Sequence, residues 1–214
     1  MTREEQKNIR ELTQTINQYI KKDSKRFGFK SISGIAYKIV NHYLYELLIS
    51  VPPIDCGSKI EAAIYFKPLI LDEVFWDVFK MKEEAEKQPF SFHITGAFTP
   101  YCDTIATWKV AITPDLDVYQ ILYTVFVDAN SIIQQNSIYF TDLIDFKNKI
   151  CTSNNPIQRL NYILCEIALE NYQKALELIT LALQNNDMGL FASSDGVDII
   201  EHAKKYCENK VLSK

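Results

Sequence analysis

Apolar side chains change their spacing along this chain of 214 residues. Over residues 3 to 22 they recur every three or four positions, which is the period of an amphipathic helix. Thr2 and Glu5 fit a capping box, in which each side chain accepts a hydrogen bond from the other residue's backbone N–H. The pattern predicts an N-terminal helix whose single apolar stripe lies on another part of the protein.

Between residues 29 and 112 the spacing falls to two, which is typical of β-strands. The alternating segments are 35–39, 43–49, 60–67, 90–97 and 103–112. Asn41-His42 lies between the first two segments and predicts a hairpin turn. We therefore expect an antiparallel sheet of about five strands, together with a helix over residues 69–87 that Pro89 stops.

The second half of the chain returns to helical spacing. Thr113-Pro114-Asp115 is a helix start, because threonine caps, proline suits the first turn and aspartate suits the positive end of the helix dipole. That helix should reach about Asn130 or beyond. Further helices are expected near Thr141, from Asn154-Asn155-Pro156, and over 197–210 with Ser194 or Asp195 as cap.

Early strands followed by late helices indicate the α+β class rather than a parallel βαβ sheet. No linker rich in proline, glycine or serine interrupts the sequence. We expect a single domain over residues 1–214, with a soft internal boundary near residue 136 between a sheet-containing part and a helical part.

Residues 156–186 resemble one tetratricopeptide-type helical hairpin, through Asn171-Tyr172-Gln173-Lys174-Ala175-Leu176-Glu177-Leu178-Ile179 and then Ala182. In that family small residues, here Ala175 and Ala182, let two helices approach, and a bulky residue such as Ile179 fills the space between them. Arg159 and Ile163 depart from the family's pattern, and no second copy occurs one period away. The resemblance implies contact with another protein; the alternative is an ordinary antiparallel helix pair.

Charge and cysteine content exclude several classes of function. The formal net charge is −4, so the basic excess of a nucleic-acid binder is missing. No run of about 18 apolar residues exists that could span a membrane. Five scattered cysteines without a CxxC pair disfavour a zinc site and a disulfide framework, which predicts reduced thiols in a cytoplasmic protein.

The sequence contains no motif for a cofactor or a metal, and neither is expected. The three histidines are far apart, and no glycine-rich loop forms a phosphate cradle. The best local set for catalysis is His93, Cys102 and Asp103, in which a Cys–His pair could form across the loop that holds the cysteine. The alternative is a surface histidine and an ordinary loop cysteine.

Large aromatic residues outside the regular stripes are the remaining candidates for binding: Trp76, Tyr101 and Trp108. Together with the lack of a motif for catalysis, a metal or a cofactor, these aromatic residues favour a protein–protein interaction module without catalytic activity. The alternative is an enzyme that uses Cys102 and His93 in a cleft between sheet and helices. The partner and the oligomeric state stay open.

Overall fold

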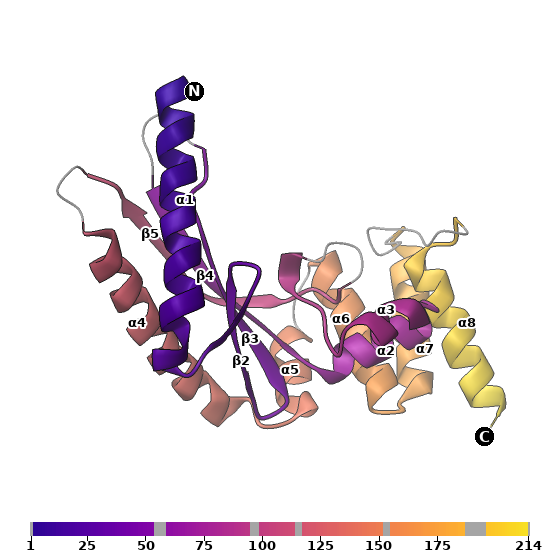
Figure 1. The fold of residues 1–214 in the computed structure, drawn as a ribbon. Helices are drawn as coiled ribbons and strands as arrows, with labels where there is room; N and C mark the ends of the chain where they lie inside the picture. Colours follow the sequence, from indigo (N-terminus) through magenta and orange to yellow (C-terminus); the bar gives the residue numbers. More distant parts are fainter. Residues whose placement is uncertain are drawn as a thin grey trace. The chain divides into compact units, whose positions relative to one another are not determined.

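The structure is a computed structural model, and it describes residues 2–53, 59–94, 99–113, 117–151, 155–186 and 196–213. The chain forms two compact units (Figure 1). Unit 1 contains Met1–Phe66 and Cys102–Tyr139, and unit 2 contains Lys67–Tyr101 and Phe140–Lys214. The expectation of a single domain with a boundary near residue 136 stays a prediction.

Unit 1 is built around a five-stranded sheet in the order β1-β2-β3-β4-β5, in which the strands β1 to β3 and the pair β4 and β5 run antiparallel. The elements are α1 (Arg3–Asp23), the 3-10 helix η1 (Ser24–Phe27), β1 (Lys30–Ile32), β2 (Ile35–Val40), β3 (Tyr43–Ser50), β4 (Lys59–Pro68), β5 (Asp103–Ala111) and α4 (Val118–Tyr139). The predicted α+β class, the N-terminal helix and the antiparallel sheet are confirmed.

Two tight turns set the register of the first three strands. Asn41 and His42 both have positive φ, 51° and 64°, which is the backbone of the hairpin turn that their position predicts. Ser33 and Gly34 make a second such turn, with φ of 47° and 82°, and it joins β1 to β2. The alternation did not predict β1, because three residues are too few to show a period of two.

One face of the sheet is consistently buried. Along β4 the buried residues alternate with half-buried ones, and the buried set is Ile60, Ala62, Ile64 and Phe66. The ring of Phe66 lies 5.7 Å from that of Tyr45 and 5.9 Å from that of Tyr43, so these β3 residues share the same face. The core of unit 1 lies between this face and its helices.

The regular elements in the described residues of unit 2 are helices, apart from the last two residues of β4. Its helices are α2 (Ile70–Val78), α3 (Lys82–Lys87), α5 (Leu143–Ile150), α6 (Pro156–Ala168), α7 (Tyr172–Gln184) and α8 (Ile199–Leu212). Each of α5, α6 and α7 packs against the next helix in the chain, and α2 packs against α6 and α8. The helices expected near Thr141 and from Asn155-Pro156 are confirmed, with Asp142 and Asn155 as their caps.

The single helix predicted over 69–87 is wrong, because the chain turns between α2 and α3. Lys80 has φ of 57°, its N–H donates to Asp77, and the N–H of Met81 donates to the carbonyl of Trp76. These bonds form a Schellman motif, in which a left-handed residue ends a helix. Glycine usually holds that position, so a lysine there gave no warning of the turn.

The strand predicted over 90–97 is also wrong. Residues 90–94 form no strand, and residues 95–98 lie outside the described part. The backbone N–H of Ser91 donates to the carboxylate of Asp72 instead of to a neighbouring strand. The rings of Phe90 and Phe92 instead contact each other, with their centres 5.4 Å apart.

One predicted helix start differs from the structure, and the predicted caps of the last helix lie outside the described residues. The helix expected from Thr113-Pro114-Asp115 begins at Val118, where the Asp117 carboxylate accepts the N–H groups of Tyr119 and Gln120. Pro114 and Asp115 lie outside the described residues. The last helix begins at Ile199, and its two predicted caps, Ser194 and Asp195, also lie outside the described residues.

The Asn41-His42 turn gives a test of the hairpin. His42 is exposed and adopts φ of 64°, which glycine accepts without a Cβ penalty. His42→Gly should raise the free energy of unfolding of unit 1 by about 0.5–1 kcal/mol, whereas His42→Ala keeps the penalty and should not. Urea unfolding followed by the fluorescence of Trp108 in a W76F background measures both. Equal midpoints for the two variants would contradict the turn geometry.

Candidate functional site

Helix α4 is fixed to unit 1 by one buried face. The residues of that face are Leu122, Val125, Phe126, Ala129 and Ile133. The Phe126 ring lies 5.8 Å from the ring of Tyr19 in α1, 5.1 Å from that of Phe27 in η1 and 5.4 Å from that of Phe29. Ring contacts at these distances stabilise packing beyond simple burial, so α4, α1 and η1 form one packed group.

Polar contacts set how α4 is rotated on the sheet. The Tyr45 hydroxyl donates to Asn136 over 3.1 Å, and the Asn41 side chain donates to the carbonyl of Ser137 over 2.8 Å. The ammonium of Lys38 donates to the side-chain oxygen of Asn130. These bonds come from β2, β3 and the turn between them, so they fix which side of α4 points away from the sheet.

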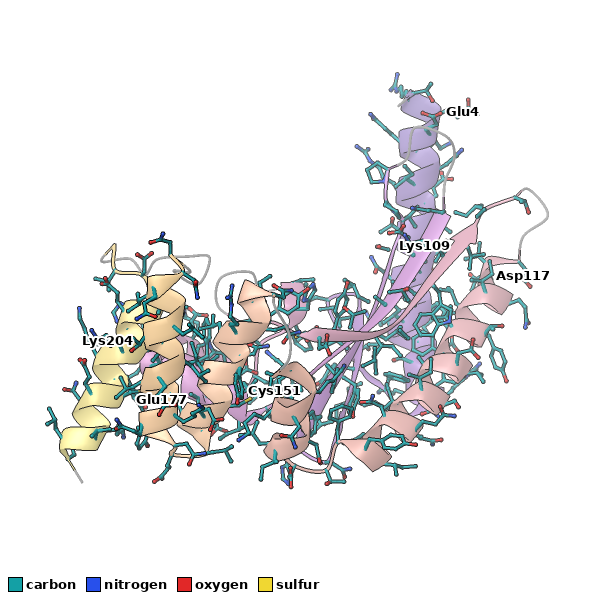
Figure 2. The ribbon with its side chains drawn as sticks, turned by 180° about the vertical axis from the view of Figure 1, so that it is seen from behind. Glu4, Lys109, Asp117, Cys151, Glu177 and Lys204 are labelled. Carbon is teal, nitrogen blue, oxygen red and sulfur yellow. The ribbon has the colours of Figure 1, made fainter. Side chains whose placement is uncertain are left out.

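Beside its buried face, α4 has an apolar and aromatic surface, on which the Tyr119 ring lies 6.0 Å from that of Tyr19 and the Tyr123 ring 5.6 Å from that of Phe27. Tyr119 is 58% exposed, Tyr123 is 52% exposed and Val127 is 41% exposed. Their spacing of four residues places them on one stripe of the helix, which we call the outer stripe. Ile138, which is 72% exposed, extends it toward the C-terminal end. Figure 2 shows the helix with its side chains, and Asp117 marks where it begins.

The whole of α4 is nearly free of charge. Its 22 residues include one charged side chain, Asp128, whereas nine of the 21 residues of α1 are charged. A surface helix normally carries charges on its exposed face. Protein interfaces lose charged residues at their centre and gain tyrosine, so α4 has the composition of an interface.

Helical spacing in the sequence includes Tyr119 and Tyr123 together with buried residues such as Phe126, whereas the structure shows the two tyrosines to be about half exposed. The signal that could have found them was the missing charge, because a helix buried on one side only should be charged on the other. The spacing of apolar residues could not separate the outer stripe from the buried face, because residues of the two sets lie next to each other in the sequence.

Of the three residues proposed for catalysis, Cys102 and Asp103 belong to unit 1 and His93 to unit 2. Cys102 is fully buried in unit 1, and its thiol lies 3.5 Å from a carboxylate oxygen of Glu46. Asp103 begins β5 and pairs in register with Phe66. His93 lies in unit 2, half-buried, with its ring 5.9 Å from that of Tyr101.

The aromatic residues proposed for binding are less exposed than the outer stripe. Trp76 is 2% exposed inside unit 2, where it offers no surface to a partner. Tyr101 is half-buried, and its backbone carbonyl accepts the side-chain N–H of Asn161. Trp108 is half-buried on β5 opposite Ala62, on the face of the sheet that is buried.

Unit 2 contains a buried polar network centred on Lys67. Its ammonium donates to Asp72 over 2.7 Å, to Ser91 over 2.6 Å and to Thr99 over 2.9 Å. The Lys67 and Asp72 side chains are 0% exposed. The Ser91 hydroxyl also lies 2.5 Å from Asp72, and the Thr99 hydroxyl donates to the carbonyl of Pro100.

This network contains a Lys–Ser pair, which some hydrolases use as base and nucleophile. A base needs a free lone pair on its nitrogen. Asp72, Ser91 and Thr99 provide Lys67 with three hydrogen-bond partners within 2.9 Å, one of them a carboxylate, so its nitrogen has no free position from which to accept the Ser91 proton. The network therefore ties together the end of β4, the first turn of α2 and the segment around Ser91, and it does not activate Ser91.

The helices α6 and α7, which span most of residues 156–186, pack against each other. Ala175, Ile179 and Ala182 are all buried along α7. Helix α2 of the same chain packs against α6, and more lightly against α8. The resemblance of this pair to a tetratricopeptide hairpin stays a prediction.

The described residues hold no group of three or more histidine, cysteine or acidic side chains that could bind a metal ion. Within the same part of the chain, no helix has both the length and the apolar character needed to cross a membrane.

No family model matches this sequence, and no curated protein or solved structure matches it.

The surroundings of His93 predict a pH dependence of unit 2. Burial, and secondly the positive charge of Lys67, hold the pKa of this imidazole below its usual 6.5. As the pH falls below about 6.5, the unfolded chain takes up the proton first, so the free energy of unfolding falls. His93→Gln removes this loss. The fluorescence of Trp76 in a W108F background reports the urea midpoint at each pH. A midpoint that falls equally in both proteins would contradict the assignment.

Proposed function

We propose that this protein is a protein–protein interaction module without catalytic activity, and that the outer stripe of α4 makes the contact. The observation that carries the proposal is a long surface helix with exposed tyrosines and one charged residue. Contiguous exposed apolar surface of this kind marks sites where proteins associate. A cytoplasmic location and a protein partner, rather than a nucleic acid, fit the scattered thiols and the net charge of −4.

The size of the outer stripe defines the kind of contact. A tyrosine side chain buries about 150–250 Å² when it is covered, and Tyr119 and Tyr123 are each a little over half exposed. The stripe then offers a few hundred Å², compared with about 800 Å² per partner in a standard stable interface. We infer a contact that is transient, or one in which the stripe is the centre of a larger surface on unit 1.

The chemistry of the outer stripe defines the partner. The exposed side chains beside it on α4 are glutamine, serine and threonine, so no charge on this face selects an oppositely charged surface. An uncharged apolar surface, such as the apolar face of an amphipathic helix, matches it best. Such a partner covers the tyrosine rings while their hydroxyl groups stay in water.

A crosslinking experiment tests the proposal. A benzophenone amino acid placed at position 123 should give one discrete crosslinked product in cells, and the same group at the exposed position 104 of β5 should not. Val127→Lys places a charge on the outer stripe and should abolish the product, because burying an unpaired charge is unfavourable. The matched control is Gln135→Lys, on the same helix but outside the stripe.

Two results would contradict the proposal. One is the same set of products from positions 123 and 104, which indicates collisions without a specific surface. The other is a product at position 123 that survives Val127→Lys. The mass of the product identifies its source, because a second copy of the chain adds 24.7 kDa and any other protein adds its own mass.

The alternative, an enzyme that uses Cys102 and His93, predicts a reactive thiol. Reactive cysteines are accessible and lie beside a cation, whereas Cys102 is buried beside a carboxylate. Among the described cysteines, we expect an alkylating reagent at neutral pH to modify the exposed Cys151 before Cys102 and Cys207, the latter because burial raises its pKa to about 11. Mass spectrometry of the peptides measures the order. Modification of Cys102 faster than free cysteine would favour the enzyme.

A further inference from the structure

Strand β5 is the last strand on one side of the sheet in unit 1 (Figure 1). It pairs with β4, and among the described residues no strand pairs with its other side. The outer side of an edge strand carries backbone N–H and C=O groups that no strand of the same sheet binds, so it is a template for a further strand. The opposite edge, β1, has three residues, whereas β5 has nine. Short edges are one way in which proteins prevent such pairing, and β5 does not use it.

A β-bulge limits the regular edge to the second part of β5. Ile64 of β4 pairs with Ala106, and the next residue of β4, Tyr65, pairs with Thr104, which skips one residue of β5. A bulge bends the strand and interrupts regular pairing. The regular edge is therefore residues 106–111, which we call the open edge and which extends over about 20 Å. Thr104 lies on the other side of the bulge and is not part of it.

The open edge has the composition of a strand that can pair. Its sequence is Ala-Thr-Trp-Lys-Val-Ala, which contains no proline or glycine and one charged residue. Threonine, tryptophan and valine favour β-strands, whereas a proline would remove a backbone donor.

The apolar face of the sheet is incompletely covered at the open edge. Three of its residues share the buried face of β4, in the pairs Ala106 with Ile64, Trp108 with Ala62 and Val110 with Ile60. In each pair the β4 residue is buried, whereas the β5 residue is half-buried. Helix α4 contacts β5, yet no residue of this strand is buried. The apolar layer therefore ends at β5, and apolar side chains of an added strand would extend it.

The other face of the open edge carries one cation, Lys109, which is labelled in Figure 2. Lys109 pairs with Glu61 of β4, and its ammonium lies 4.0 Å from that carboxylate. The same carboxylate also binds Lys59, and the Lys109 side chain is 70% exposed. A lysine on an edge opposes pairing with most strands, because the charge meets apolar or like-charged neighbours. A strand with an acidic residue beside Lys109 avoids that penalty, so the charge selects the partner.

We propose that the open edge binds an extended segment of another protein, which becomes a sixth strand of the sheet. The segment places apolar side chains beside Trp108 and Val110, and an acidic side chain beside Lys109. A second copy of the open edge offers Lys109 no carboxylate, because this lysine is the only charged residue of the edge. The open edge shares no residue with the outer stripe of α4, so it stands or falls independently of the contact proposed there.

The capped peptide acetyl-Thr-Val-Glu-Val-Thr-Val-amide tests the open edge on the whole protein. In a W76F background the fluorescence of Trp108 should shift to shorter wavelength and saturate, because the added strand covers the indole ring. Hydrogen exchange of alternate backbone amides in residues 106–111 should slow, because these N–H groups then donate to the peptide. The same peptide with every backbone nitrogen methylated keeps the side chains but has no N–H donor, and it should cause neither change.

A charge exchange tests the selection by Lys109. Lys109→Glu should weaken binding of the glutamate peptide about threefold, and it should strengthen binding of a peptide with lysine in place of glutamate by a similar factor. Lys59→Glu makes the same change on the same face but one strand further in. This matched control should keep the wild-type preference for the glutamate peptide.

Three results would overturn the proposal. The first is a fluorescence shift that never saturates with the glutamate peptide, and the second is equal binding of the methylated peptide. The third is slower exchange of the same amides when the protein is concentrated without peptide, which would assign the edge to a second copy of the chain. Val127→Lys, in the outer stripe, should bind the peptide as the wild type does, so failure at one surface is distinguishable from failure at the other.

Discussion

The packing of Phe126 holds the helices of unit 1 together. The Phe126 ring is fully buried and contacts aromatic rings from α1, η1 and the residue that leads into β1. These contacts hold α4 against the N-terminal part of the chain, and the bonds from Lys38, Asn41 and Tyr45 fix its rotation. Since the rotation of α4 is fixed, the outer stripe stays at the surface. Packing explains why these residues are exposed, but it does not explain why they are tyrosine and valine rather than charged residues.

The two units use polar groups in different ways. Unit 2 buries Lys67 with a carboxylate and two hydroxyl groups, so each of its donors has an acceptor inside the protein. Unit 1 buries Lys38 only in part and gives it an amide and an aromatic ring. A saturated network fixes local structure in unit 2, and the bond from Lys38 to Asn130 helps to fix the rotation of α4 in unit 1.

Local signals predicted the fold where they were strong. The capping box of Thr2 and Glu5, and the turn at Asn41-His42, both appear as expected. Predictions from the sequence were wrong where tertiary contacts replaced local ones. The backbone N–H of Ser91, for example, donates to Asp72 and not to a neighbouring strand, so the strand predicted over 90–97 does not form there. Prediction also failed at Lys80, which ends a helix where glycine would be usual. The outer stripe was missed because helical spacing identifies apolar residues without showing which of them are covered.

The most direct test of the account is the solvent accessibility of the outer stripe inside cells. Hydroxyl-radical footprinting measures the oxidation of Tyr123 in the purified protein and in intact cells, with the 74% exposed Tyr139, outside the stripe, as internal reference. A covered stripe predicts that the ratio of Tyr123 to Tyr139 oxidation is lower in cells than in the purified protein. An equal ratio in both settings would contradict the claim that another protein covers this face.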